Sequence, residues 1–188
     1  MYFLLLLITA LLLISIFSSN WPVKLYHDLF LRKIARELGT EPVRHGLLLS
    51  GVYSEIVTVC QGKEIRIRFL ENSIDSIKAN SGLEIRIKED IGLVMEFYRI
   101  KLNKKPWGDF RQFKSGDQVI DSEWLILTTD LDRSKEFWER TQLTELLRTI
   151  PQLDQILINH REMIIQLKNY QSVKAILNII DRVISCFP

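Results

Sequence analysis

The chain has 188 residues, of which 47% are hydrophobic and 26% are charged, and its formal net charge is +2. This length supplies the core of one domain of ordinary composition, and the small net charge excludes the strong basic field that attracts nucleic acids. The two cysteines, Cys60 and Cys186, lie far apart and form neither a disulfide framework nor a metal-ligand spacing. We therefore expect two buried free thiols.

The first predicted element is an apolar helix over residues 1–20. Its first 17 residues contain no charge and only two polar side chains, Thr9 and Ser15. At about 1.5 Å per residue they reach about 26 Å, slightly less than a hydrocarbon core of about 30 Å. Trp21 follows where an interfacial aromatic residue is expected. Three interpretations compete: a retained transmembrane helix, a cleaved signal peptide and a buried core helix.

We favour the retained transmembrane anchor. A signal peptide has a basic residue before its apolar run and an A-x-A-like cleavage site after it. This sequence has no Lys or Arg before the run, and Phe17, two residues before Ser19, is too large for such a site. Lysine and arginine follow the run at Lys24, Arg32 and Lys33, and none precedes it. The positive-inside rule therefore places the rest of the chain in the cytoplasm. We expect a single-pass protein of the cell membrane, with the lipid bilayer as its first partner.

A second, juxtamembrane helix is predicted over residues 21–39. Its apolar residues recur every three or four positions and are Val23, Tyr26, Phe30, Ile34 and Leu38. Gly39 is a typical helix stop. Two interpretations remain: basic side chains hold the helix on the membrane surface, or the apolar stripe packs on the soluble domain over residues 40–188. We favour packing on the domain, because the stripe is long.

From residue 47 the hydrophobic period changes to two, which is typical of strands with one buried face. Ile56, Thr58 and Cys60 alternate with Val57 and Val59 before a Gln61-Gly62 turn. After the turn, Ile65 and Ile67 alternate with Arg66 and Arg68. In the segment LEIRIK, which begins at Leu83, the apolar residues should face inward and the charged residues should face water. Further strands are predicted in GLVMEFYRIKL and EWLILTTD.

Helical patterns return in the last third of the chain. Asp130 or Asp132 is the expected cap of the helix DRSKEFWER, and Thr141 that of the helix QLTELLRTI. A hairpin is predicted around residues 159–162, and a helix over residues 172–187 follows it. The sequence therefore predicts an α+β fold: a single N-terminal transmembrane helix, then a domain with a mainly antiparallel sheet and several helices.

Candidate catalytic and metal-ligating residues are few. The histidines His27, His45 and His160 have no second ligand at a metal spacing, and no nucleophile or phosphate-loop motif is present. Acidic residues gather around one predicted strand and are Asp117, Asp121, Glu123, Asp130 and Asp132. Paired carboxylates can bind cations or transfer protons, but helix caps explain acids at a strand–helix junction. We expect no catalytic residue, metal or cofactor.

The most suggestive stretch is the basic and aromatic segment RIKLNKKPWGDFRQFK. Its candidate contact residues are Lys101, Lys104, Lys105, Trp107, Phe110, Arg111 and Lys114. Basic side chains near anionic headgroups, with tryptophan at headgroup depth, are typical of membrane-contacting loops. A membrane or a partner protein is the expected contact, and a solvated loop with its aromatic side chains folded under is the alternative.

Four segments between residues 47 and 170 follow one another in a familiar order: SGVYSEIVTVCQGKEIRIRF, VIDSEWLILTTD, QLTELLRTI and DQILINHREMIIQLKN. This order resembles a family of uncharacterised bacterial membrane-anchored proteins of unknown function. Gly51, Tyr53, Asp121 and Trp124 stand at the matching positions. The resemblance implies a membrane-anchored α+β domain and implies no activity.

The sequence therefore predicts a single-pass membrane-anchored protein with a non-catalytic interaction domain. A membrane protein is the expected macromolecular partner, no nucleic acid is expected, and the oligomeric state is open. Two alternatives remain. One is a membrane-tethered enzyme, such as a hydrolase, that uses the acidic residues near Asp121. The other is an accessory subunit of a larger membrane complex.

Overall fold

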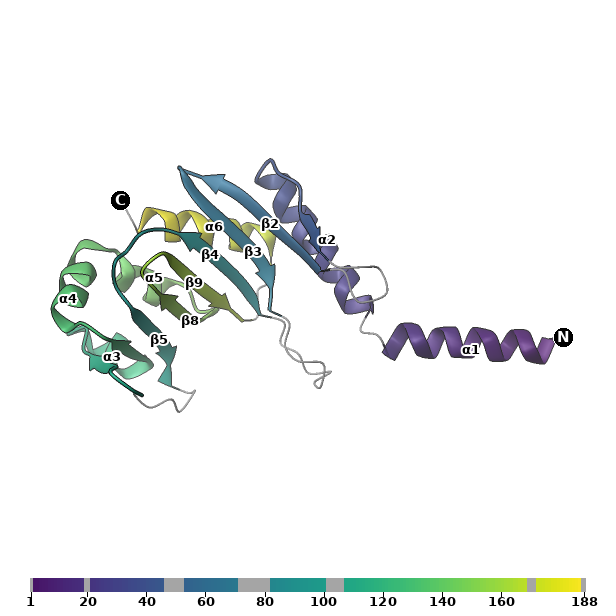
Figure 1. Cartoon of the computed structure of the whole chain (residues 1–188), viewed down its shortest axis with the longest axis horizontal. Helices are drawn as coiled ribbons and strands as arrows, with labels where there is room; N and C mark the ends of the chain where they lie inside the picture. Colours follow the sequence, from purple (N-terminus) through teal and green to yellow (C-terminus); the bar gives the residue numbers. More distant parts are fainter. Residues whose placement is uncertain are drawn as a thin grey trace. The chain divides into compact units, whose positions relative to one another are not determined.

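The structure is a computed structural model that describes residues 2–18, 21–45, 53–70, 82–100, 107–168 and 172–186, with the backbone alone over residues 12–18 and 21–24 and at residue 53. The chain divides into two compact units, residues 1–56 and residues 57–188. Strand β2 (Tyr53–Cys60) begins in the first unit and ends in the second. Figure 1 shows the elements coloured along the chain.

The first unit contains two helices and a short strand pair. Helices α1 (Tyr2–Ser18) and α2 (Trp21–Glu37) form over the two segments with predicted helical character. Strand β1 (Val43–His45) pairs antiparallel with the start of β2. Gly39 follows α2 with a φ of 67°, the left-handed conformation that commonly ends a helix.

Among the described residues, no helix combines the length and the apolar character needed to cross a membrane. The predicted helix at residues 1–20 is therefore confirmed as a helix but not as a transmembrane span. Helix α1 has 17 residues, which reach about 26 Å, whereas a hydrocarbon core is about 30 Å thick. Its apolar side chains are nevertheless exposed, with exposed fractions of 88% for Tyr2, 70% for Leu6 and 58% for Leu11.

The predicted apolar stripe of α2 is buried only in part. Phe30 and Ile34 are buried as predicted, and Leu31 and Ala35 are buried beside them. Tyr26, which belongs to the predicted stripe, is 56% exposed. The buried face of α2 is therefore rotated toward Leu31 and Ala35 relative to the face that the sequence pattern predicts.

Asp28 links α2 to the strand pair of the first unit. Its carboxylate forms ion pairs with Arg32 at 2.9 Å and with Arg44 at 3.2 Å, and it accepts a short hydrogen bond from the Ser54 hydroxyl. The neighbouring His27 is half-buried, and this burial lowers its pKa to about 4, because loss of solvent disfavours the charged imidazolium. His27 is therefore neutral at physiological pH.

The second unit is built on one sheet. Besides β2, its strands are β3 (Lys63–Phe69), β4 (Leu83–Lys88), β5 (Met95–Arg99), β6 (Arg111–Phe113), β7 (Trp124–Thr128), β8 (Leu153–Ile158) and β9 (Glu162–Leu167). Their order across the sheet is β2-β3-β4-β9-β8-β5-β7-β6. From β3 to β6 every neighbouring pair is antiparallel. The late hairpin β8–β9 thus lies between β4 and β5.

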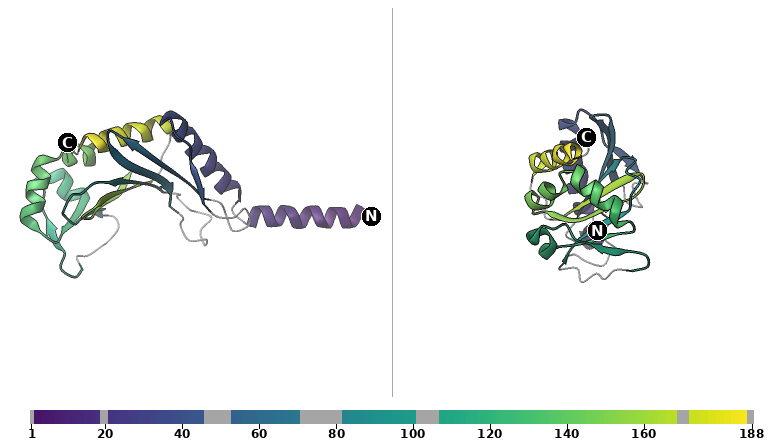
Figure 2. Two further views of the ribbon diagram at one scale, coloured as in Figure 1. Left: turned by 45° about the horizontal axis from the view of Figure 1, so that its top comes forward. Right: turned by 90° about the vertical axis from the view of Figure 1, so that its left-hand side faces the viewer.

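Helices cover one face of this sheet (Figure 2). They are α3 (Gln118–Glu123), α4 (Leu131–Arg140), α5 (Leu143–Thr149) and α6 (Val173–Ser185). Trp138 of α4 packs on Phe97 and Phe113, with ring centroids 6.3 Å and 5.7 Å apart. The apolar side chains of β3, β4 and β9 alternate with polar ones, so the core lies between the sheet and these helices.

The predicted α+β architecture is confirmed, and most of the turns and caps agree with it. Gln61 and Gly62 both have positive φ, at 50° and 81°, as a two-residue hairpin turn requires. Asp130 caps α4, as predicted, by accepting a hydrogen bond from a backbone N–H of the first turn. The predicted cap at Thr141 is wrong: its hydroxyl donates to the Phe137 carbonyl and so satisfies the end of α4 instead of the start of α5.

The segment before β7 is a helix, which ends at Glu123, the first residue of the predicted strand EWLILTTD. The Asp117 carboxylate accepts hydrogen bonds from the backbone N–H groups of Val119 and Ile120 and caps α3. Ile120 is buried, and the strand begins only at Trp124. An N-cap aspartate satisfies backbone donors that a strand would leave to a neighbouring strand. This local cap prevails over the alternating pattern of a short segment.

Neutral His27 predicts a pH dependence of stability. Below its ordinary pKa of 6.5, the unfolded chain takes up a proton that the folded chain takes up only near pH 4. The contribution of His27 to the free energy of unfolding is therefore fully present above about pH 6.5 and is lost as the pH falls toward 4. Urea denaturation of wild type and His27→Gln across this window should show a smaller fall in unfolding free energy for the variant. Equal falls in both chains would contradict the burial of a neutral imidazole.

Candidate functional site

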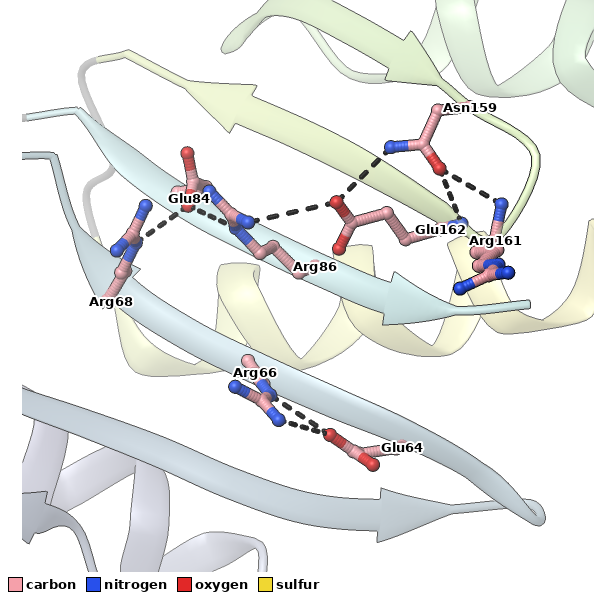
Figure 3. Close-up of polar contacts among 8 residues, drawn as sticks. All are labelled: Glu64, Arg66, Arg68, Glu84, Arg86, Asn159, Arg161 and Glu162. Carbon is pink, nitrogen blue, oxygen red and sulfur yellow. Dashed lines mark hydrogen bonds and ion pairs between the residues drawn. The ribbon is translucent and has the colours of Figure 1, made fainter. Parts of the chain in front are cut away.

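The candidate site lies on the sheet face opposite the helices, at the β3–β4–β9 end of the second unit. Strand alternation places the apolar residues of β3 and β4 against the core and their charged residues on the opposite face. The antiparallel register pairs Arg66 with Arg86, and Arg68 with Glu84. Figure 3 shows these side chains in front of the strands, with α6 behind them.

Glu84 is the buried centre of this charged face. Its side chain is 4% exposed, and its Oε1 accepts hydrogen bonds from Nε of Arg68 and Nε of Arg86, each at 2.7 Å. A buried carboxylate is costly unless it is paired and hydrogen-bonded, and two guanidinium groups supply both here. The prediction that Glu84 faces water is therefore wrong, because its own strand and β3 place two arginines against it.

Two further carboxylates on this face, Glu64 and Glu162, form ion pairs with its cations. Glu64 accepts hydrogen bonds from Nε and Nη2 of Arg66 at 2.9 Å and 2.8 Å, and it lies 3.5 Å from Nζ of Lys88. The Arg66 hydrogen bond first, and the Lys88 charge second, lower the pKa of Glu64. Glu162 lies 3.8 Å from Nη1 of Arg86. The face therefore carries a network of ion-paired side chains with two separate centres, Glu84 and Glu64.

The β8–β9 turn brings Arg161 to the edge of this network. Oδ1 of Asn159 accepts hydrogen bonds from the backbone N–H groups of Arg161 and Glu162 at 2.9 Å and 3.0 Å. The Asn159 amide also donates to the Glu162 carboxylate at 3.2 Å. A shallow depression of about 570 Å³ lies between the strands and this turn, and its lining residues are Glu64, Arg66, Arg86, Lys88, Asn159, His160, Arg161 and Glu162.

The predicted basic and aromatic segment lies only partly within the described residues. Lys101, Lys104 and Lys105 lie outside the residues that the structure describes; the residues of this segment that it does describe are Trp107, Phe110, Arg111 and Lys114. Trp107 is 63% exposed, and its ring centroid lies 5.1 Å from that of Phe110. Trp107 is therefore available for contact and is not folded under the loop.

The acidic residues near β7 have structural partners. Asp117, which caps α3, also forms an ion pair with Arg148 of α5. Oδ1 of Asp121 accepts hydrogen bonds from both the backbone N–H and the hydroxyl of Ser115, each at 2.9 Å. These contacts tie the loop before α3 to the helix. Within the described ranges, no group of three or more histidine, cysteine, aspartate or glutamate side chains is arranged to hold a metal ion.

The cysteines and the remaining histidines are dispersed. Cys60 and Cys186 are free thiols, as predicted, although Cys60 is only half-buried. Burial, with a smaller effect of Glu145, raises the pKa of Cys186 to about 11, so this thiol is protonated and unreactive. His45 lies 3.5 Å from Glu55 in the first unit, and His160 lines the depression of the second.

The charged face was not predicted as a site. The patterns Arg-Ile-Arg in β3 and Arg-Ile-Lys in β4 indicate a polar face on each strand, but neither pattern reveals the neighbours. Only the register of β3 with β4, and of β4 with β9, brings Arg66, Arg86 and Glu162 together. The two basic alternations, on strands separated by 13 residues, were the one signal that could have identified it.

No protein-family model matches the chain, and no curated protein matches it significantly. Among solved structures, its fold is similar to the crystal structure of the mycobacterial trehalose monomycolate transport factor A, TtfA. The TM-score is 0.61, the sequence identity is 13%, and the match covers 85% of this chain and 91% of that chain. At this identity the similarity shows the fold alone. These comparisons therefore assign the chain to no family, and the resemblance to uncharacterised membrane-anchored proteins remains a prediction.

Glu84→Gln should test the centre of the charged face. The change removes the charge that compensates Arg68 and Arg86, but these partners are 39% and 32% exposed and are partly solvated. We expect the free energy of unfolding in urea to fall by about 1–3 kcal/mol. Glu64→Gln, a more exposed carboxylate on the same face, is the matched control and should cost less. A larger loss for Glu64→Gln would contradict the central role of Glu84.

Proposed function

We propose that this protein is a non-catalytic accessory protein that acts at a membrane and binds a partner protein through the sheet face of its second unit that the described helices of that unit leave uncovered. The proposal rests on how the two faces of this sheet differ. Four helices cover one side of the sheet, and the opposite side presents an ordered array of charged side chains at the β3–β4–β9 end.

On the same face, apolar side chains lie next to the charged ones. The register places Ile164 of β9 beside Arg86, and Leu157 of β8 beside Ile164. Both apolar side chains are partly exposed. An apolar patch flanked by arginine and other charged groups is typical of protein-binding surfaces. The arginines are also held by carboxylates before any partner arrives, which lowers the entropy cost of binding.

The fold supports an accessory role by analogy. TtfA is named as a mycobacterial trehalose monomycolate transport factor. Fold similarity is a weak guide to function, so the analogy extends only to the class of role. We propose that this chain likewise assists a membrane-bound transport or assembly system, as a partner of one of its proteins.

Photo-cross-linking should identify the partner-binding face. A photoreactive amino acid at Ile164 should give one discrete cross-linked product in cells, and Leu157→Glu should abolish it by placing a charge in the apolar patch. The same amino acid at Lys135, which is exposed on the opposite, helical side, is the matched control and should give none. A discrete product from Lys135 and none from Ile164 would contradict the proposed face.

We also propose that α1 attaches the protein to lipid. Its side chains are apolar on all sides and exposed from Tyr2 to Leu11, and a helix that is apolar all round requires a non-aqueous environment. The segment from Lys101 to Lys114 is a second proposed lipid contact, with exposed Trp107 at headgroup depth. The cytoplasmic location of the second unit remains a prediction.

Leu7→Arg should weaken this attachment. An arginine at the centre of an inserted helix costs about 2.5–3.5 kcal/mol, so much of the protein should move from the membrane fraction to the soluble fraction at high salt. Leu7→Met, which keeps the side chain apolar, is the control and should stay with the membrane. If Leu7→Arg remains fully membrane-bound at high salt, α1 is not the attachment.

A further inference from the structure

We infer that the depression on the charged face binds the phosphate group of a phosphate monoester. The inference rests on the proposed function in one respect, because it uses the same uncovered face. The residues that line the depression include four cationic side chains and two carboxylates, an excess of two positive charges. The cations are Arg66, Arg86, Lys88 and Arg161, and the carboxylates are Glu64 and Glu162.

Arg66 and Arg86 lie directly opposite each other in the β3–β4 register. Like charges at opposite positions of neighbouring strands repel. The two guanidinium groups also bind different carboxylates, since Arg66 bonds to Glu64 and Arg86 bonds to Glu84. Both arginines line the same depression. An anion in this depression would therefore attract both arginines at once and would reduce their repulsion.

The carboxylates of the face are already shared between cations. Glu84 is paired with both Arg68 and Arg86, and Glu64 is paired with both Arg66 and Lys88. Pairs elsewhere in the second unit, such as Lys168 with Asp154 at 2.7 Å, join one cation to one carboxylate. The positive excess is thus a property of this face, and Lys88, whose side chain is 71% exposed, is accessible to a ligand.

The amount of charge favours a phosphate monoester over a carboxylate. A phosphate monoester carries about −1.5 to −2 charges at pH 7 and offers three strong acceptor oxygens, which matches the excess of two. A carboxylate carries a single negative charge and would leave one of the two excess positive charges uncompensated. The planar guanidinium groups of Arg66 and Arg86 provide the paired N–H donors that suit phosphate oxygens.

The size of the depression favours a small ligand or a lipid headgroup. Its volume of about 570 Å³ falls within the range of about 300–1,000 Å³ that is usual for small-molecule sites. A soluble phosphate ester and the headgroup of phosphatidic acid present the same terminal phosphate. The geometry assigns the phosphate chemistry, and the experiment below distinguishes the two sources.

Equilibrium dialysis of the full chain in an uncharged detergent should detect binding of radiolabelled glycerol 3-phosphate. Binding should weaken as salt rises, and inorganic phosphate should compete far better than acetate. Arg66→Gln and Arg161→Gln should each weaken binding about tenfold or more, as expected for the loss of a charged hydrogen bond. Arg133→Gln, which removes a 70% exposed arginine on α4, is the matched control and should bind like wild type.

Circular dichroism should show that Arg66→Gln is folded, since the change removes one of two facing like charges. To identify the source of the phosphate, binding of glycerol 3-phosphate is measured with the chain in phosphatidylcholine nanodiscs, with and without phosphatidic acid. Weaker binding of glycerol 3-phosphate in discs with phosphatidic acid assigns the site to the lipid headgroup. Equal binding in both discs assigns it to a soluble ester.

Two results would overturn the inference. One is that wild type binds no glycerol 3-phosphate at low salt. The other is that Arg133→Gln weakens binding as much as Arg66→Gln, which would reduce the effect to general charge attraction. Neither result alters the expected cross-link from Ile164, so a failed phosphate site and a failed partner-binding face give different outcomes.

Discussion

The buried carboxylate of Glu84 constrains the charged face of the second unit. It accepts hydrogen bonds from Arg68 and Arg86 while its side chain is 4% exposed, so it is stable only in the register that keeps both arginines beside it. A shift of β4 by one residue would turn every charged side chain of LEIRIK into the core and every isoleucine outward. The cost of an unpaired buried charge therefore helps to select one register, and that register determines which cations share the depression.

The one-sided helix cover explains why this face is available. Apolar side chains of the sheet meet aromatic and aliphatic side chains of α3 to α6, as Trp138 does on Phe97 and Phe113, and this burial supplies the stability of the unit. At its β3–β4–β9 end the opposite face carries charged side chains, several of them in ion pairs, which are stable in contact with water. A sheet stabilised from one side leaves the other free for recognition, and the array of arginines there is ordered in advance by carboxylates.

The first unit combines a water-facing and a lipid-compatible part. Asp28 joins α2 to β1 and β2 through Arg44 and Ser54, and burial keeps His27 neutral. Helix α1, by contrast, exposes leucines on its surface and is slightly shorter than a bilayer core. An apolar surface of this kind favours lipid or another apolar surface, which agrees with the proposed role at a membrane.

Local patterns in the sequence determined the element types, the order of helices and strands, the Gln61-Gly62 turn and the cap at Asp130, because each depends on residues close in the chain. The same patterns failed at Glu123, where the helix capped by Asp117 ends in place of a strand start, and at Glu84, whose burial depends on β3. Tertiary structure alone decided that β9 lies beside β4 and that Arg66 faces Arg86. The physical reason is that strand order and register arise from long-range pairing, in which the energy of a charged side chain depends on neighbours that are distant in sequence.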